Sequence, residues 1–184
     1  MSKQFKKASE MAWYRKCRNR IKESEGFRAK PYFDQKGYRT ALYGRNIELK
    51  VMRMRPPSVN AEELIFALEH LDDPLAIGEK IIDDDLGGEY LNLIAYFGGE
   101  YERPIMAEHD FDKLPDDCKI ALCDMAYNMG FGGLMGFVNM LEAIDEKDWQ
   151  TAYYECLDSE YARDSATKHR ANKNAMLLLN CEEE

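Results

Sequence analysis

The stretch that decides the fold reads Glu25-Gly26-Phe27-Arg28-Ala29-Lys30-Pro31-Tyr32-Phe33-Asp34-Gln35-Lys36-Gly37-Tyr38-Arg39-Thr40. It follows a segment with helical periodicity and then changes into short runs rich in Tyr, Phe and Thr. Pro31, residues 34–37 and Gly44 interrupt these runs, so residues 27–47 are predicted to form a small hairpin or meander. A Glu therefore ends a helix, and an Asp and a Thr follow it on the hairpin.

Helical periodicity marks the chain on both sides of this hairpin. Apolar residues recur every three or four positions from Phe5 to Ile21, which predicts a basic amphipathic helix that ends at Gly26. Asn60 and Glu63 have the spacing of a capping box. Gly87-Gly88 is expected to be a weak point in a long acidic helix. The further helices are expected at about 60–70, 74–97, 116–129, 134–144, 148–158 and 167–180.

Composition and charge narrow the class of protein. The chain has 184 residues, 45% of them hydrophobic, which suits one ordered globular domain over 1–184. The net charge is −9, but residues 1–55 carry +11 and residues 56–184 carry −20. These opposite charges either neutralise each other across an internal interface or let the basic part meet an anionic polymer.

Several functional classes receive no support from the sequence. No apolar run is long enough to span a membrane, and residues 1–7 lack the apolar core of a signal peptide. We therefore expect synthesis in the cytoplasm, no stable membrane insertion, no nucleic-acid partner and a monomer. No pattern predicts a metal site or a cofactor. The cysteines have no Cys-x-x-Cys spacing and are expected to be reduced, mostly buried thiols: Cys17, Cys118, Cys123, Cys156 and Cys181.

The pair Glu25 and Asp34 suggests glycosidase chemistry. Glycoside hydrolysis uses two carboxylates in unlike environments, one as a proton donor and one as an anion that activates water or stabilises positive charge. A helix end and a hairpin that face each other across a groove could supply that pair, and Thr40 could hold the water. The spacing alone is weak evidence, because surface charges around a turn would give the same pattern.

The surrounding residues resemble the phage-type lysozymes, glycoside hydrolase family 24. The first block resembles the start of that family in order and spacing, and two later blocks are similar to its next helix and its buried central helix with the loop after it. These blocks are Glu25-Gly26, Tyr32-x-Asp34, Gly37-Tyr38, Thr40 and Gly44; residues 57–61; and residues 121–130 through Gly136-Phe137-x-Asn139, with Trp149 beyond.

The resemblance implies an α+β fold, mostly α, with a small β-hairpin lobe and a larger helical lobe joined by a long helix. The implied segments are an N-terminal amphipathic helix (1–26), a β-containing lobe (27–55), an acidic helical connection (56–113) and a helical lobe (114–180). It also implies Glu25 as general acid, Asp34 as the carboxylate that activates water or stabilises the transition state, and Thr40 as the residue that positions water.

Further residues follow from the same resemblance. Asn46, Tyr127 and Asn128 fall where the family lines its groove, although core packing explains Tyr127 nearly as well. Leu42 stands where the family usually has Gly, which puts activity in doubt.

Two other departures concern charged residues. Arg45 replaces a frequent His and could form a substitute ion pair with Asp85. The Arg that the family places beside its catalytic Glu has no firm match, since Arg170 needs a two-residue shift and Lys168 needs none.

The resemblance implies a peptidoglycan muramidase that cuts the β-1,4 bond between N-acetylmuramic acid and N-acetylglucosamine during lysis or remodelling of the bacterial wall. Its partner would be peptidoglycan glycan strands, reached in the periplasm through a pore, through lysis, or by a secretion or phage apparatus. The alternative is a non-catalytic lysozyme-like module that binds wall glycan or a partner protein.

Overall fold

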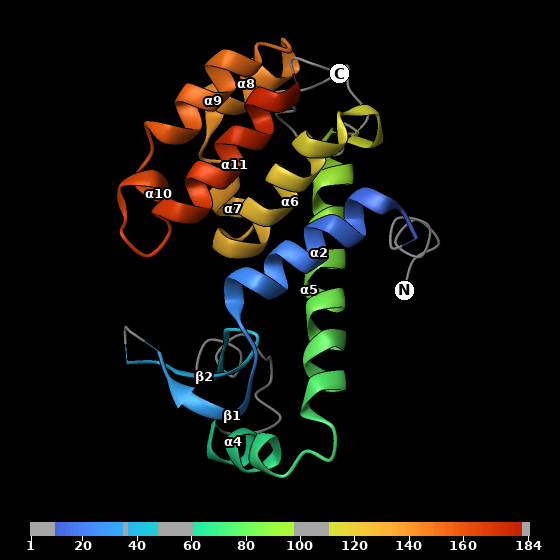
Figure 1. The fold of residues 1–184 in the computed structure, drawn as a ribbon, viewed down its shortest axis with the longest axis vertical. Coiled ribbons are helices and arrows are strands. Elements are labelled where there is room, and N and C mark those ends of the chain that lie inside the picture. Colours follow the sequence, from blue (N-terminus) through green and yellow to red (C-terminus); the bar gives the residue numbers. More distant parts are fainter. Residues whose placement is uncertain (1–9, 35–36, 48–60, 98–110, 182–184) are drawn as a thin grey trace. The chain divides into compact units, whose positions relative to one another are not determined.

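The computed structural model describes residues 10–34, 37–47, 61–97 and 111–181. The chain divides into two compact units: unit 2 is Ile21–Asp84, and unit 1 is Met1–Arg20 with Asp85–Glu184. The boundaries fall within two helices, α2 (Ala12–Glu25) and α5 (Pro74–Phe97). The described elements confirm a mostly helical α+β protein with one small antiparallel sheet (Figure 1).

Unit 2 contains the sheet, in the order β1-β2-β3. β1 (Arg28–Phe33) pairs antiparallel with β2 (Arg39–Leu42), which pairs antiparallel with β3 (Arg45–Asn46). β1 contains Pro31, which an edge strand tolerates because proline cannot donate to a neighbouring strand. The predicted hairpin or meander over 27–47 is therefore confirmed.

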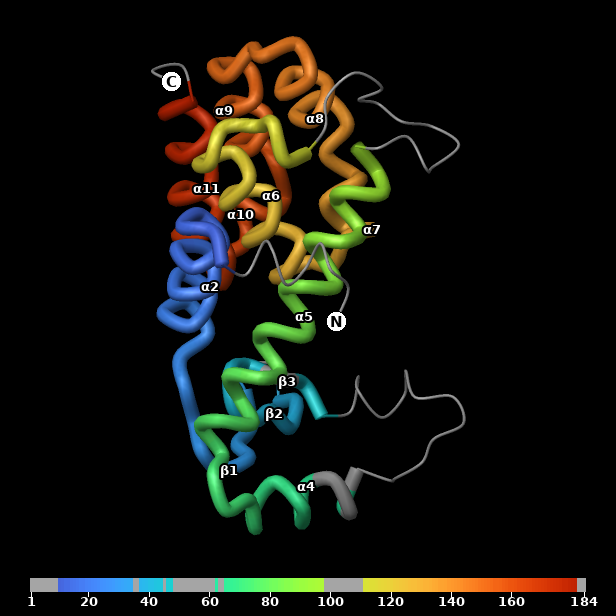
Figure 2. Tube along the Cα trace, turned by 90° about the vertical axis from the view of Figure 1, so that its right-hand side faces the viewer, coloured from blue at the N-terminus to red at the C-terminus, as the bar shows by residue number. Residues whose placement is uncertain are grey.

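A small apolar core holds the sheet of unit 2 to its helices. α4 (Ala61–Glu69) contacts β1 and lies beside it in Figure 2. The buried centre of this core consists of three residues at the end of β2 and just after β3, and four half-buried residues from α4, α5 and the loop between them pack on it. The members are Ala41, Leu42 and Ile47, with Ile65, Leu68, Leu71 and Ile81.

Leu42 has a left-handed backbone conformation, with φ at 56°. Such a φ favours glycine, because a Cβ atom is crowded there. The Leu42 side chain is nonetheless 1% exposed, within the core of unit 2. A leucine at this position thus introduces backbone strain, and burial of its apolar side chain offsets it.

Replacing Leu42 by alanine and by glycine tests this account. The glycine variant should be the more stable of the two. Leu42→Ala should lower the free energy of unfolding by about 3 kcal/mol, because it empties a core position and keeps the strained φ. Leu42→Gly should cost about 1 kcal/mol less than Leu42→Ala, because it also relieves the strain. Urea denaturation of both variants measures the difference. A glycine variant less stable than the alanine variant would contradict this account of Leu42.

The described part of the N-terminal helix begins at Ala12. α2 starts at Ala12, whereas Glu10 and Met11 form a turn and a bend, and residues 1–9 lie outside the described residues. The Met11 carbonyl accepts the Arg15 N–H at 3.2 Å, and the Trp13 indole N–H lies 3.3 Å from the Met11 sulfur. Met11 therefore occupies the cap position of α2. The predicted helix is interrupted at Glu10 and Met11, and its part over residues 5–9 lies outside the described residues.

α5 confirms the predicted range and corrects one detail. It runs unbroken from Pro74 to Phe97, so the predicted weak point at Gly87-Gly88 is absent from this helix. Leu86, Tyr90 and Leu93 on α5 are buried. Tertiary packing of this kind outweighs the low helix propensity of two glycines.

Unit 1 is built around a buried helix, as the sequence predicts. α6 (Asp116–Met129) is buried continuously from Cys118 to Ala126. It packs on α11 (Lys168–Asn180), which packs on α9 (Trp149–Leu157), which in turn packs on α8 (Val138–Asp145); Figure 1 shows these helices as neighbours. Three short helices of three or four residues escaped prediction: η1 (Phe111–Lys113), α7 (Phe131–Leu134) and α10 (Glu160–Arg163).

Aromatic residues join α2, α5 and η1 inside unit 1. The rings of Trp13, Tyr90 and Phe111 have centroids 5.7–6.2 Å apart, and Phe97 lies 5.4 Å from Phe111. Such edge-to-face and tilted pairs add to the apolar area that they bury. They explain why a segment of the N-terminal helix belongs to unit 1.

The cysteines are free and buried, as predicted. Burial raises the pKa of the Cys156 thiol to about 12, and it also raises the pKa of Cys118 and Cys123. A thiol must ionise to react as a nucleophile, so these three side chains act as packing residues at neutral pH.

Candidate active site

Glu25 is the last residue of α2 and is half-buried. The helix stops there because Gly26 adopts φ +66° and its N–H donates to the Lys22 carbonyl at 3.0 Å. One turn earlier, Lys22 forms an ion pair with Glu79 of α5. These contacts fix the end of α2 within unit 2 and thereby fix the base of the Glu25 side chain.

Gly44 lies directly against the Glu25 carboxylate. It occupies the turn between β2 and β3 with φ +67°, and a Cβ atom at this position would overlap Glu25 Oε2 and lie 3.4 Å from Cδ. Only a residue without a side chain fits both the backbone conformation and the space. The β2–β3 turn is therefore shaped around Glu25.

Aromatic packing also holds this turn in place. The rings of Phe27 and Tyr43 are 5.2 Å apart, and both lie close to Gly78 of α5, where a Cβ would be 3.2–3.3 Å from them. Tyr43 is 7% exposed. The residues on each side of the Glu25–Gly44 contact are thus packed against α5 within unit 2.

Asp34 lies in the turn that follows β1 and is half-buried. Its Oδ1 accepts the Tyr38 N–H at 2.8 Å, its own N–H donates to the Tyr38 carbonyl at 2.9 Å, and its carbonyl accepts the Gly37 N–H at 3.0 Å. Three hydrogen bonds thus orient Asp34 from within its own hairpin.

Thr40 shares a hydrogen-bond partner, Tyr38, with Asp34. It is 3% exposed on β2, and its hydroxyl donates to the Tyr38 carbonyl at 3.1 Å. Across the sheet it pairs with Tyr32 of β1 and Asn46 of β3. Tyr38 therefore links Asp34 and Thr40.

Unit 2 therefore brings together four of the residues singled out in the sequence: Glu25, Asp34, Thr40 and Asn46. Thr40 and Asn46 are paired, and Asn46 follows Gly44 by two residues. The Glu25 carboxylate lies against Gly44. Carboxylates from a helix end and from a hairpin turn are thus joined to one small sheet, with a hydroxyl and an amide on the paired strands.

The remaining sequence candidates belong to unit 1 or lie outside the description. Asn128 is exposed near the end of α6 and lines a cleft of about 700 Å³. Tyr127 is half-buried and does not line this cleft. Asp85 is half-buried in α5. The Arg45 side chain lies outside the described residues, so the Arg45–Asp85 ion pair stays a prediction.

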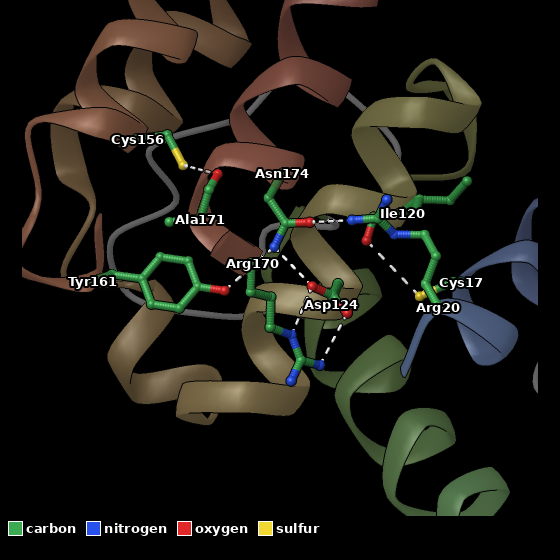
Figure 3. Close-up of polar contacts among 9 residues, drawn as sticks. All are labelled: Cys17, Arg20, Ile120, Asp124, Cys156, Tyr161, Arg170, Ala171 and Asn174. Carbon is green, nitrogen blue, oxygen red and sulfur yellow. Dashed lines mark hydrogen bonds and ion pairs between the residues drawn. The ribbon is translucent and has the colours of Figure 1, made fainter. Parts of the chain in front are cut away.

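A buried polar network in unit 1 escaped prediction from the sequence. Asp124 of α6 is fully buried and accepts two hydrogen bonds from Arg170, both at 2.9 Å, and a third from Asn174 at 2.8 Å. The Asn174 side-chain oxygen accepts a 2.8 Å hydrogen bond from Arg20 of α2 (Figure 3). An acid in the middle of a mostly apolar buried helix was the available signal, because such a group needs partners.

Arg170 belongs to this network. Of the two residues that could match the family's arginine, Arg170 of α11 has the more buried environment, with its side chain 10% exposed against Asp124. Lys168 is exposed at the start of α11. Arg170 is therefore held in unit 1 by a two-pronged ion pair of the kind that guanidinium groups make well.

Two other kinds of site are absent from the described residues. No group of three or more His, Cys, Asp or Glu residues in this part of the chain is arranged to hold a metal ion. None of the described helices is long and apolar enough to cross a membrane.

Comparison with known proteins gives a distant relative. The chain is 26% identical over 176 residues to the pre-baseplate central spike protein Gp5 of Enterobacteria phage T4, and the match covers 86% of this chain but 27% of that protein. The chain thus spans about a quarter of the length of the curated relative that it matches. No family model matches the chain. The chain is thus similar, at a distance, to part of a phage baseplate protein.

Proposed function

We propose that this protein is a lysozyme-like muramidase that hydrolyses the β-1,4 bond between N-acetylmuramic acid and N-acetylglucosamine in peptidoglycan. The observation that carries the proposal is the contact of the Glu25 carboxylate with Gly44, in the sheet whose hairpin presents Asp34 and Thr40. Two carboxylates and a water-binding hydroxyl are the groups that glycoside hydrolysis needs.

In the proposed reaction, Glu25 donates its proton to the glycosidic oxygen as the bond from the muramic acid C1 to that oxygen breaks. Asp34, oriented by Tyr38, faces the positive charge that develops at C1 and accepts a proton from the attacking water. Since the Thr40 hydroxyl donates to the Tyr38 carbonyl, its oxygen can accept a hydrogen bond from that water. The water adds to C1, and both sugars leave with free hydroxyl groups.

The relative supports this proposal at a coarser level. The matched protein is a baseplate spike protein of a phage, and a wall-cutting unit suits a phage protein. Synthesis in the cytoplasm and delivery to the periplasmic wall by a phage or secretion apparatus, a pore or lysis are part of the proposal. So is action as a monomer without a cofactor.

The burial of Leu42 supports the catalytic proposal over a module that binds without cutting. Its side chain is buried in the core of unit 2. The sheet thus accommodates a leucine in place of glycine by strain at one residue. The catalytic proposal is therefore preferred.

The direct experiment is digestion of purified sacculi. The protein should release soluble fragments and new reducing ends in proportion to enzyme and time. Turbidity and a reducing-sugar assay follow the two signals. Saturable binding to sacculi without new reducing ends would overturn the catalytic proposal and favour the binding module.

Replacing Gly44 by alanine tests the Glu25 contact. The added methyl group must displace the Glu25 carboxylate, and a shift of about 1 Å at a catalytic group costs on the order of 10²-fold in turnover. Gly130→Ala is the matched control: Gly130, in unit 1, has φ +81°, but no described atom lies within 4 Å of its Cβ position. Equal losses in the two variants would show that backbone strain alone explains the effect.

A further inference from the structure

A second cavity of unit 1, with a volume of about 340 Å³, shares no lining residue with the cleft beside Asn128. It lies where the connection from η1 to α6 meets the turn from α8 to α9 and Cys181, which follows α11. All of these segments belong to unit 1. The volume is within the range of small-molecule sites, although at its lower end.

Most of the lining of this cavity is apolar and fixed by the core. Four of its side chains are at most 7% exposed: Leu114, Ile144, Trp149 and Cys181. The Cys181 thiol donates to the Leu177 carbonyl at 3.2 Å, so its hydrogen is already committed to the protein. A preformed apolar wall of this kind removes an apolar group of a ligand from water.

The charged residues of the lining are both basic. They are Lys113 and Lys147, which are exposed, and the lining contains no Asp or Glu. Residues 56–184, which include the whole cavity, carry a net charge of −20. The cavity therefore has the opposite sign of charge to the segment that builds it.

No described carboxylate neutralises these two lysines. Lys119, Arg163 and Arg170 each form an ion pair with an acid of unit 1. Within the described part of the chain, Lys113 and Lys147 have neither an ion pair nor a side-chain hydrogen bond. An anion at the cavity would therefore meet two ammonium groups without displacing a described acid.

Lys147 has a left-handed backbone conformation, with φ at 59°. It closes the end of α8, where its N–H donates to the Ile144 carbonyl at 3.1 Å and the Asp148 N–H donates to the Ala143 carbonyl at 2.8 Å. Glycine is the usual residue at such a helix end, because a Cβ atom is crowded there. The Asp148 carboxylate accepts the Thr151 N–H at 3.0 Å and so caps α9. The turn thus holds a strained lysine at the cavity and directs the neighbouring acid to a helix.

We propose that this cavity binds an amphiphilic anion, a small molecule with an apolar body and an anionic head. The body fills the apolar part of the cavity against Ile144 and Trp149, and the head pairs with the ammonium groups of Lys113 and Lys147. Lysines act as point charges and do not require a planar head. The site is independent of the muramidase proposal, because none of its residues belongs to unit 2.

Titration of octanoate into the isotope-labelled full chain, followed by NMR below the micellar concentration, tests the inference. The protein has two tryptophans, so the indole N–H of Trp149 reports on the cavity and that of Trp13 serves as an internal reference. We expect a saturable shift of the Trp149 signal, and binding of octanol that is about tenfold weaker because its head is neutral. Equal affinities for octanoate and octanol, or no saturable shift of Trp149, would overturn the proposal.

Variants separate the two lysines from general charge. Lys113→Gln combined with Lys147→Gly removes both charges, and glycine suits the positive φ at position 147, so the fold should persist. This variant should bind octanoate no better than octanol. Lys173→Gln, an exposed position of α11 outside the lining, should keep the tenfold preference. A preference that survives the double substitution, or that Lys173→Gln abolishes, would contradict the assignment.

The glutamates that follow Cys181 in the sequence, Glu182, Glu183 and Glu184, are the alternative partners of the two lysines. A variant with all three replaced by glutamine distinguishes these partners from a ligand. If the cavity serves a ligand, this variant should bind octanoate within about fivefold of the wild-type affinity, because exposed ion pairs are weak. Octanoate binding by this variant, with none by the wild type, would assign the lysines to these glutamates and overturn the proposal.

Discussion

Replacing Glu25 by glutamine should lower the rate of peptidoglycan hydrolysis by about 10³-fold, because the amide cannot give a proton to the leaving oxygen. Glutamine has nearly the same shape as glutamate, so the contact with Gly44 and the fold should persist. The rate of release of reducing ends from sacculi, with circular dichroism as a check of the fold, measures the effect.

Glu23 provides the matched control for Glu25. It is exposed on the same helix, two residues earlier. Glu23→Gln removes the same charge without touching the sheet, so its rate should stay within about twofold of wild type. Equal rates for wild type and Glu25→Gln would contradict the role given to Glu25.

Replacing Asp124 by alanine should lower the free energy of unfolding by about 3–5 kcal/mol, the usual effect of breaking a buried ion pair. The substitution removes the acceptor of two bonds from Arg170 and one from Asn174. It leaves a guanidinium group that is 10% exposed without its carboxylate. Since domains are stable by only about 5–15 kcal/mol, such a loss should be visible in urea denaturation.

Asp117 supplies the comparison for Asp124. It pairs with Lys16 at 2.8 Å, but the lysine side chain is 58% exposed. Solvent-exposed pairs contribute about 0–1 kcal/mol, so Asp117→Ala should have a small effect. A loss below 1 kcal/mol for Asp124→Ala would show that the network of Asp124 is not a stabilising centre of unit 1.

The helices of this protein were largely predictable, because their apolar residues repeat at helical spacing. α5 has the predicted bounds, and α6 is the predicted buried helix. The start of α2 was not predictable from hydrophobic periodicity alone. The apolar repeat begins before Met11, but Met11 caps the helix. The weak point predicted at Gly87-Gly88 was wrong for a related reason. Local helix propensity does not show that Leu86 and Tyr90 pack in the core.

The candidate site was predictable in its residue types but not in its geometry. Spacing and resemblance singled out Glu25, Asp34 and Thr40, yet neither shows that Tyr38 orients both hairpin residues. The left-handed φ of Leu42 is likewise a property of the folded chain, since the sequence shows only an unexpected leucine.

The polar network and the cleft of unit 1 depend on contacts between distant segments. Arg170 and Asp124 are 46 residues apart, and Arg20 and Asn174 are 154 apart. Periodicity places each residue on its helix but does not show which helices meet. Only the fold reveals that the acids of α9 and α10 share one cavity.

The central claim is that this protein cuts peptidoglycan by adding water to C1 of N-acetylmuramic acid. The most direct measurement is mass spectrometry of the soluble products after digestion of sacculi in ¹⁸O-water, with immediate borohydride reduction to fix the label. The account predicts fragments that end in reduced N-acetylmuramic acid with one ¹⁸O atom, formed by wild type and not by Glu25→Gln. Fragments that end in N-acetylglucosamine or in an anhydro sugar, or sacculi left intact by the wild type, would contradict it.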